Sequence, residues 1–173
     1  SDYSAAIYAK YLNAKVLEIW TDVSGVFSAN PKIVKKASPI SYLSYKEAME
    51  LSFFGAKVIY FPTLQPLIED NIPVFIKNTF EPDEEGTCIS NSTKLDNDEV
   101  VKGISHIENI SILNFEGSGM VGVPGFSKRF FEALSSNHIN VIMITQASSE
   151  YSICVAIDSN YVDLAKEVVD KEF

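Results

Sequence analysis

The chain has 173 residues, of which 46% are apolar and 21% charged, as in an ordinary globular protein with a real core. Its net charge of −9 argues against a nucleic-acid partner, because binding to phosphates requires a basic surface. No apolar run reaches the roughly 18 residues that a membrane span requires, and no signal peptide is visible. Cys88 and Cys154 have neither metal-site spacing nor disulfide density, which favours a reducing cytoplasm.

Helices and strands alternate in the first part of the chain. The chain begins without Met on Ser1, directly in a helical pattern, so we expect it to be cut from a longer protein. The patterns predict helices over 1–13, 44–53 and 62–71, and strands over 15–20 and 74–77. This alternation is typical of an α/β sheet covered by helices. The loop over 21–31 follows the first strand at its carboxyl end, where open α/β sheets bind ligands.

A polar, acidic stretch over 81–100 separates this part from a second unit. It is expected to be a linker with one short strand at 87–90. Beyond it, the patterns predict strands over 101–106, 110–115, 141–145 and 151–157, and helices over 126–136 and 161–171. From residue 110 onward, the βαββα order favours a ferredoxin-like α+β unit that lacks its closing strand.

The glycine-rich segment over 117–125 joins a predicted strand to a predicted helix. Such a turn presents backbone N–H groups at a helix N-terminus, where a carboxylate or phosphate binds well. It has no following Lys-Ser/Thr, so it matches an amino-acid site better than a nucleotide site. A turn without any ligand is the alternative.

Polar candidates in the first unit are Asp2, Asp22 and Lys57. Asp22 follows a buried strand and would project into the cleft at the sheet edge. Lys57 has apolar neighbours, so its ammonium group would suit phosphate oxygens. A helix cap and a solvated lysine are the alternative interpretations. His106 and His138 are expected to be structural or exposed, and neither a catalytic triad nor a metal motif is present.

Four stretches resemble aspartate kinases, and together they span nearly the whole chain in the family's order. Residues 1–6 (SDYSAA) resemble the end of the family's Gly-Arg-Gly-Gly-Ser-Asp segment. Residues 20–32 (WTDVSGVFSANPK) resemble its nucleotide loop, and residues 45–58 resemble the next motif, which ends in a Lys-Val pair. The segment over 117–125, with 145–150 (TQASSE), resembles the first ACT domain, especially that of bifunctional aspartokinase–homoserine dehydrogenases.

The resemblance implies a fold and a division of the chain. The fold is a partial amino-acid-kinase α/β sheet followed by a ferredoxin-like ACT domain. We expect the C-terminal part of the kinase domain over 1–80, an acidic linker over 81–100 and an incomplete ACT domain over 101–173.

The resemblance also implies roles for individual residues. Asp2 matches a catalytic aspartate near the transferring phosphoryl group. The positions that match the ATP site are Thr21, Asp22, Phe27, Lys32, Lys57 and Val58. The positions that match the effector pocket or its rim are Met120, Gly125, Phe126, Asn140, Val141, Gln146, Ser149 and Glu150.

Three departures from the family pattern affect these expectations. Asn30 and Lys32 replace the usual Asp and Arg, and residues 60–62 (YFP) replace a His-Pro segment. The family's Lys-Phe-Gly-Gly-Thr-Ser motif is absent from the chain. Phosphoryl transfer relies on positioning and electrostatics, so we expect this polypeptide alone to be inactive.

The implied activity is aspartate kinase, with ATP and Mg²⁺ as cofactors of the full-length protein and none required by this piece. The implied partners are an amino-acid effector, with threonine favoured over lysine, and a second copy bound through the ACT domains. No nucleic-acid or membrane partner is expected. A stand-alone amino-acid-binding module and a non-catalytic α+β interaction domain remain the alternatives.

Overall fold

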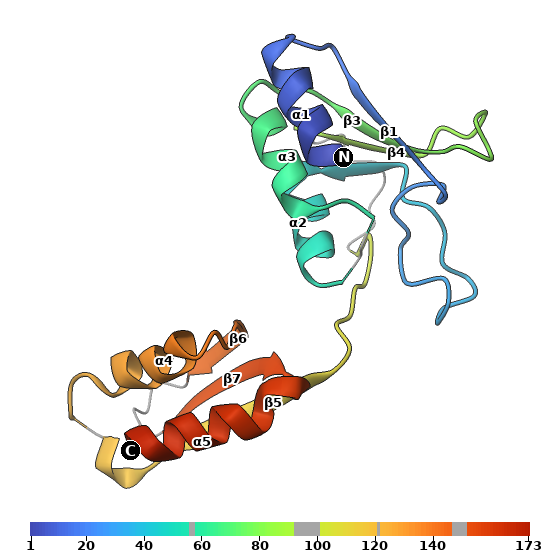
Figure 1. Cartoon of the computed structure of the whole chain (residues 1–173). Helices are drawn as coiled ribbons and strands as arrows, with labels where there is room; N and C mark the ends of the chain where they lie inside the picture. The colour runs from blue at the N-terminus through green and yellow to red at the C-terminus, as the bar shows by residue number, and fades with distance from the viewer. Residues whose placement is uncertain (56–57, 92–100, 121, 147–151) are drawn as a thin grey trace. The chain divides into compact units, whose positions relative to one another are not determined.

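A computed structural model describes the chain except for residues 56–57, 92–100, 121 and 147–151 (Figure 1). It divides into two compact units, Ser1–Ile107 and Glu108–Phe173. The division follows Ile107, whereas the sequence patterns put the start of the second unit at residue 101. The expected strand over 101–106 is wrong, because these residues form no regular element. The amide of Ile104 instead donates to the Ser28 carbonyl at 2.8 Å, within the first unit.

The described residues of the first unit form a four-stranded sheet with three helices on one face (Figure 1). The helices are α1 (Asp2–Tyr11), α2 (Tyr45–Phe53) and α3 (Phe61–Ile68). The strands are β1 (Leu17–Thr21), β2 (Tyr42–Ser44), β3 (Val74–Asn78) and β4 (Thr87–Ser90), in the order β1-β3-β4-β2. The alternating α/β order is thus confirmed, as is the short strand at 87–90. The sequence patterns did not predict β2.

Local signals explain where these elements begin and pack. The Ser44 hydroxyl accepts from the amide of Glu47, while the Ser44 amide donates to the Glu47 carboxylate, so the capping box is formed. Along β3, every second residue is buried, and Val74 and Ile76 are fully covered. Leu64 and Leu67 of α3 belong to the same core cluster. Burial of this apolar face holds the helices on the sheet.

The second unit has the predicted βαββα order. Its elements are β5 (Ile110–Glu116), a short 3-10 helix η1 (Ser118–Met120), α4 (Phe126–Ser136), β6 (Val141–Gln146), β7 (Ser152–Asp158), a 3-10 turn η2 (Ser159–Tyr161) and α5 (Val162–Glu172). The sheet is antiparallel in the order β5-β7-β6. Phe130 of α4, Ala165 of α5 and Val155 of β7 share one buried core.

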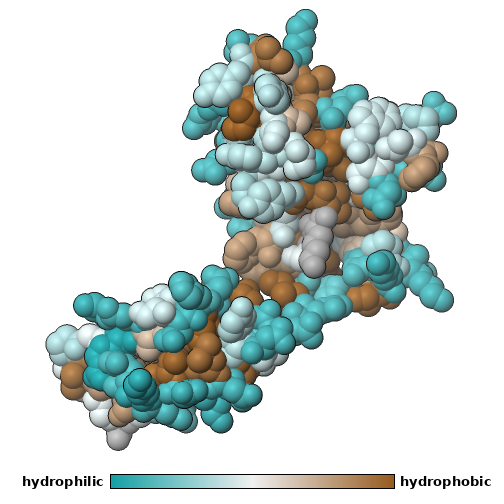
Figure 2. Space-filling model, in the orientation of Figure 1, coloured by the Kyte–Doolittle hydropathy of each residue, from teal (hydrophilic) through white to brown (hydrophobic). Residues whose placement is uncertain are grey.

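The two units have separate cores, and apolar side chains also reach the surface of both (Figure 2). Among the described residues, no helix combines the length and apolarity needed to cross a bilayer.

Candidate functional site

One edge of the first sheet gathers the ends of three strands. β1 and β3 run parallel, with Thr21 opposite Asn78, so both end at this edge. β4 runs antiparallel to β3 and begins there, with Thr87 opposite Ile76. The edge loop, residues 22–41, leaves β1 at this place and leads to β2. The sequence expectation of a loop at the carboxyl end of β1 is therefore confirmed.

Asn78 and its neighbours hold the start of the edge loop. The Asn78 side-chain amide donates to the Ser24 hydroxyl at 2.9 Å and to the Glu81 carboxylate at 3.0 Å. Ser24 donates to the same carboxylate at 2.5 Å, which closes a triangle of hydrogen bonds. The amide of Thr79 donates to the Thr21 carbonyl at 2.8 Å. Because Asn78 is only 7% exposed, its side-chain amide is largely shielded from water.

Thr87 holds the middle of the loop. Its hydroxyl accepts from the amide of Val26 at 2.8 Å and donates to the Ile40 carbonyl at 2.7 Å. The Thr87 side chain is fully buried. Gly25 adopts a φ of +116°, and a Cβ added there would lie 2.3 Å from the Thr87 oxygen. Only glycine therefore fits this approach.

The outer part of the loop is a narrow hairpin. Phe27 bridges Pro39 in an antiparallel arrangement, and the amide of Ile40 donates to the Val26 carbonyl at 2.8 Å. Beyond this bridge, the amide of Lys32 donates to the Asn30 side-chain oxygen at 3.0 Å. This Asx-type turn leaves the Lys32 side chain exposed, so its charge is free to meet an anion.

The structure brings some of the predicted ATP-site residues together. Thr21 and Asp22 lie at the sheet edge, where the Thr21 hydroxyl donates to the Asp22 carboxylate at 3.1 Å, and Phe27 and Lys32 follow on the same loop. Asp2 is the first residue of α1, and among the described residues no hydrogen bond joins it to the loop.

The remaining two expected nucleotide positions follow α2. Val58 is half-buried in a turn between α2 and α3. Lys57 lies outside the described residues.

Sequence reasoning missed the residues that shape the loop: Ser24, Asn78, Glu81 and Thr87. One signal was present, because Asn78-Thr79 stands at the end of β3 just as Thr21-Asp22 stands at the end of β1. Parallel neighbouring strands place such residues at one edge. The pairing of β1 with β3 was not readable from the pattern, so the signal could not be used.

Trp20 stands immediately before this edge. Its indole N–H donates to Glu18 at 3.2 Å, and the Lys77 ammonium lies 4.9 Å from its ring centroid. It is the only tryptophan of the chain and is 44% exposed. Its fluorescence therefore reports on the first unit and on ligands at the edge loop.

The glycine segment lies at one end of the second sheet. The end of β5 faces the start of β7, with Glu116 opposite Ser152, and Gln146 of β6 lies opposite Ile153. The segment after β5 and the end of β6 therefore share this end. Gly125 is the N-cap of α4 with a φ of +99° and offers no capping side chain. Since no side chain among the described residues caps α4, its first N–H groups can bind a carboxylate.

The expected effector residues divide between the two ends of this sheet. Met120 ends η1, Gly125 caps α4 and Phe126 begins it, and these residues lie at the end of the sheet that carries Gln146. Asn140 and Val141 lie at the other end of β6, roughly 16 Å away at about 3.3 Å per residue. Ser149 and Glu150 lie outside the described residues. One copy of the unit therefore does not gather all the described candidates around one small ligand.

Comparisons with known proteins match both units. Residues 1–78 match the amino acid kinase family, and residues 113–173 match an ACT domain. The bifunctional aspartokinase/homoserine dehydrogenase of Haemophilus influenzae is 47% identical over the whole chain. The chain spans 21% of the length of that relative.

Two solved structures of Escherichia coli aspartokinase III resemble the chain. The complex with aspartate and ADP (R-state) has a TM-score of 0.77 and 33% identity, over 91% of this chain and 34% of that one. The complex with lysine and aspartate (T-state) has a TM-score of 0.75 and 29% identity, over 99% of this chain and 38% of that one. The chain thus belongs to the aspartokinase family, with an amino acid kinase region followed by an ACT domain.

Proposed function

We propose that the protein containing this chain is an aspartate kinase, a phosphotransferase with a carboxyl acceptor. It would transfer the γ-phosphoryl group of ATP to the β-carboxylate of L-aspartate and form 4-phospho-L-aspartate. This is the first step toward lysine, threonine and methionine. The observation that carries the proposal is the edge loop, held at the carboxyl ends of β1 and β3 in a region that matches amino acid kinases.

The residues of the edge divide the work of binding ATP. Phe27 and Val58 offer apolar surface for the base, and Thr21 and Asp22 offer hydrogen-bonding oxygens at the strand end. The Lys32 ammonium would balance phosphate charge, although it lacks the bidentate geometry of the Arg that is usual in the family. Asp2, in the first turn of α1, would lie near the transferring group. We assign Lys57 to the phosphates from the resemblance alone.

Mg²⁺ enters the proposal with the nucleotide. When bound, the ion would neutralise negative charge that develops on the phosphates during transfer. Within the described part of the chain, no group of three His, Cys, Asp or Glu residues could hold a metal ion. Because Mg²⁺ sites commonly use one or two carboxylates plus phosphates, Asp2 and Asp22 are sufficient candidates.

The second unit is proposed to sense an end product of the pathway. The α4 N-terminus at Gly125 would bind the effector's carboxylate, and Gln146 shares that end of the sheet. Asn140 and Val141 lie at the opposite end, so a second copy is needed to complete the site. We therefore propose a homodimer through the ACT units. Threonine is favoured over lysine as the effector because 145–150 resembles the bifunctional type.

A reducing compartment, the cytoplasm, is part of the proposal. Among the described residues neither cysteine is part of a disulfide: Cys88 lies in β4 and Cys154 in β7. Disulfides are rare in such compartments.

An activity assay tests the central claim. The full-length protein should form aspartyl phosphate, trapped as the hydroxamate, only with ATP, Mg²⁺ and aspartate together. Lys32→Met should raise the KM for ATP about tenfold, because one phosphate contact is lost. Lys35→Met, three residues away and also exposed, is the matched control and should leave it unchanged. Absence of aspartyl phosphate would refute the activity.

The 173-residue chain by itself should form no aspartyl phosphate, since its sequence lacks the Lys-Phe-Gly-Gly-Thr-Ser motif. Detectable product from the purified chain would overturn this expectation. Titration of ATP into the chain, followed by Trp20 fluorescence, then shows separately whether the edge loop alone binds nucleotide.

Calorimetry with threonine and lysine tests the sensor, and sedimentation tests the dimer. We expect heat with threonine, and loss of that heat in Gln146→Ala. Silence toward both amino acids in a folded dimer would favour a plain interaction domain. Binding of the effector without any kinase activity in the full-length protein would favour a regulatory module.

A further inference from the structure

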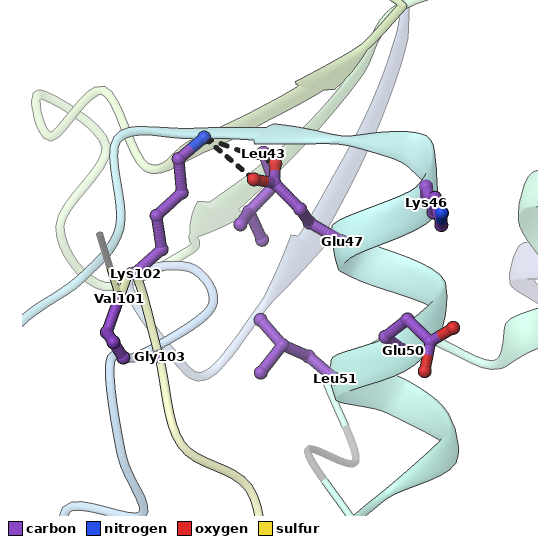
Figure 3. Close-up of a pocket in the computed structure, with 8 residues that line it drawn as sticks. All are labelled: Leu43, Lys46, Glu47, Glu50, Leu51, Val101, Lys102 and Gly103. Carbon is purple, nitrogen blue, oxygen red and sulfur yellow. Dashed lines mark hydrogen bonds and ion pairs between the residues drawn. The ribbon is translucent and has the colours of Figure 1, made fainter. Parts of the chain in front are cut away.

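Residues 102–106, here called the strap, cross the first unit between the edge loop and α2. The strap is the last part of that unit before the chain enters the second one at Glu108. It borders a cleft of about 380 Å³ that is also lined by α2 (Figure 3). Every contact described below lies within the first unit, so it does not depend on where the second unit sits.

The first contact joins the strap to α2. The Lys102 ammonium lies 3.1 Å from each carboxylate oxygen of Glu47 and 5.8 Å from the centre of the Tyr42 ring. Figure 3 shows the Lys102 side chain reaching across to Glu47. The Glu47 carboxylate also closes the capping box of α2, so it is already oriented before Lys102 meets it. Such pre-ordering lowers the entropic cost of the ion pair.

The ionised state of the Glu47 carboxyl favours its ion pair with Lys102. Burial alone would raise the pKa of the Glu47 carboxyl. The hydrogen bonds from Ser44 and the contact with Lys102 outweigh burial, so the pKa is held below its usual value. Glu47 is therefore ionised throughout the neutral range, as Lys102 requires.

The second contact joins the strap to the edge loop. The amide of Ile104 donates to the Ser28 carbonyl at 2.8 Å. At Gly103, an added Cβ would lie 3.3 Å from Ile40, 3.4 Å from the Ser28 carbonyl oxygen and 3.5 Å from Leu51. Figure 3 shows Leu51 pointing from α2 toward this part of the strap. The strap is thus fitted closely between Ser28 of the loop and Leu51 of the helix.

The third contact lies at the end of α2. Gly55 has a φ of +108°, and a Cβ added there would stand 2.1 Å from the carbonyl oxygen of His106. The strap therefore touches two segments that neighbour expected nucleotide contacts in the sequence. Ser28 follows Phe27, and Gly55 precedes Lys57 by two residues.

We propose that the strap positions the edge loop for ATP, and that the Glu47–Lys102 pair couples this position to the second unit. The strap continues directly into the second unit. A displacement of residue 107 would therefore be transmitted to Ser28 through the hydrogen bond from the Ile104 amide. The pair fixes the strap at its other end. Lys102 and Glu47 are positioning residues that touch no substrate. The inference rests on the proposed function, because it takes the edge loop as the ATP site.

Steady-state kinetics of the full-length protein test the positioning. Lys102→Met should raise the KM for ATP about fivefold and leave kcat within about twofold, since the reacting groups stay in place. Lys102→Arg keeps the cation and should restore the wild-type KM. Glu47→Gln should act like Lys102→Met, because Gln at this position still closes the capping box but lacks the charge. The double variant should show no further loss, as expected for one shared contact.

The same kinetics, measured with and without the effector, test the coupling of the strap to the second unit. In the wild type, a saturating effector should raise the KM for ATP. In Lys102→Met, the ratio of the KM with effector to the KM without it should shrink toward one. Gly103→Ala, which crowds Ile40 of the edge loop without touching a charge, is a second variant and should shrink the ratio as well.

The outcomes separate the two claims. Suppose that Lys102→Met, Glu47→Gln and Gly103→Ala all keep the wild-type KM for ATP and only lower the midpoint of thermal unfolding. The contacts of the strap would then be purely structural, and its proposed role in positioning the edge loop would be overturned. If the effector leaves the KM for ATP of the wild type unchanged, the coupling alone is overturned. A wild type that forms no aspartyl phosphate would sink the proposed function and the strap with it.

Discussion

The hydroxyl group of Thr87 accepts a hydrogen bond from the amide of Val26 at 2.8 Å, although the two residues lie 61 positions apart in the chain. The same hydroxyl donates to Ile40, so one side chain joins both arms of the edge loop. A loop of this length would otherwise sample many conformations. Thr87 therefore converts a flexible connection into a defined surface at the sheet edge.

Replacement of Thr87 by valine should destabilise the first unit by about 2–4 kcal/mol. Valine has nearly the same shape but leaves the Val26 N–H and the Ile40 carbonyl buried without their partner. Thr87→Ser keeps the hydroxyl and should cost about 1 kcal/mol, from the lost methyl group alone. Urea unfolding followed by Trp20 fluorescence measures both variants. Equal losses in the two variants would show that the hydroxyl contributes nothing.

Three glycines should respond to alanine in a graded order. Gly25→Ala combines a positive φ with a collision against Thr87 and should cost more than about 3 kcal/mol. Gly125→Ala has the positive φ in open space and should cost about 1–2 kcal/mol. Gly119→Ala has neither problem and should be neutral or slightly stabilising.

Each variant needs a readout from its own unit. Trp20 fluorescence reports on the first unit, which contains Gly25, and amide hydrogen exchange reports on the second, which contains Gly119 and Gly125. A cost at Gly119 similar to that at Gly125 would mean that backbone conformation does not determine the order.

Tyr45 should make the first unit sensitive to alkaline pH. Burial raises the pKa of the Tyr45 phenol to about 12, and the hydroxyl donates to the Ile72 carbonyl at 2.5 Å. The folded state therefore keeps this proton when the unfolded chain has lost it. The resulting stability is complete below pH 10 and decreases as the pH rises toward 12, by about 2–3 kcal/mol.

Tyr45→Phe is the matched control for this prediction. It should lose about 1 kcal/mol at neutral pH, from the missing hydrogen bond. Its stability should then decline less steeply than that of the wild type between pH 10 and 12. Parallel curves for the two proteins in urea titrations across this range would contradict the assignment.

Arg129 should fasten the end of α5 to α4. Its guanidinium donates to the Glu172 carboxylate and to the Glu172 carbonyl, each at 2.6 Å, and lies 4.4 Å from the Phe173 ring centroid. Arg129→Lys should cost about 0.5–1 kcal/mol and increase amide exchange near the end of α5, because lysine lacks the planar fork. Lys128→Arg on the same helix should change neither quantity. Identical amide exchange in Arg129→Lys and Lys128→Arg would show that Arg129 does not hold the end of α5 against α4.

The sequence by itself determined the helices, most strands and the family. Period-3.6 and alternating apolar patterns are local, so α2, β3 and the βαββα order of the second unit could be read directly. The capping box at Ser44 and the glycine at the start of α4 also depend only on neighbouring residues. The candidate residues Thr21, Asp22 and Lys32 were found because they lie within one contiguous motif.

Only the tertiary structure decided how distant segments meet. Ser24, Asn78, Glu81 and Thr87 became one network because β1, β3 and β4 share an edge, and strand pairing is a non-local property. For the same reason, residues 101–106 form no strand: their hydrogen bonds and packing come from Ser28 and Glu47, far away in the chain. Val141 and Gln146, which the resemblance assigns to the effector pocket or its rim, lie at opposite ends of β6. Local preferences determine the elements, whereas side-chain contacts across the fold determine which elements build a site.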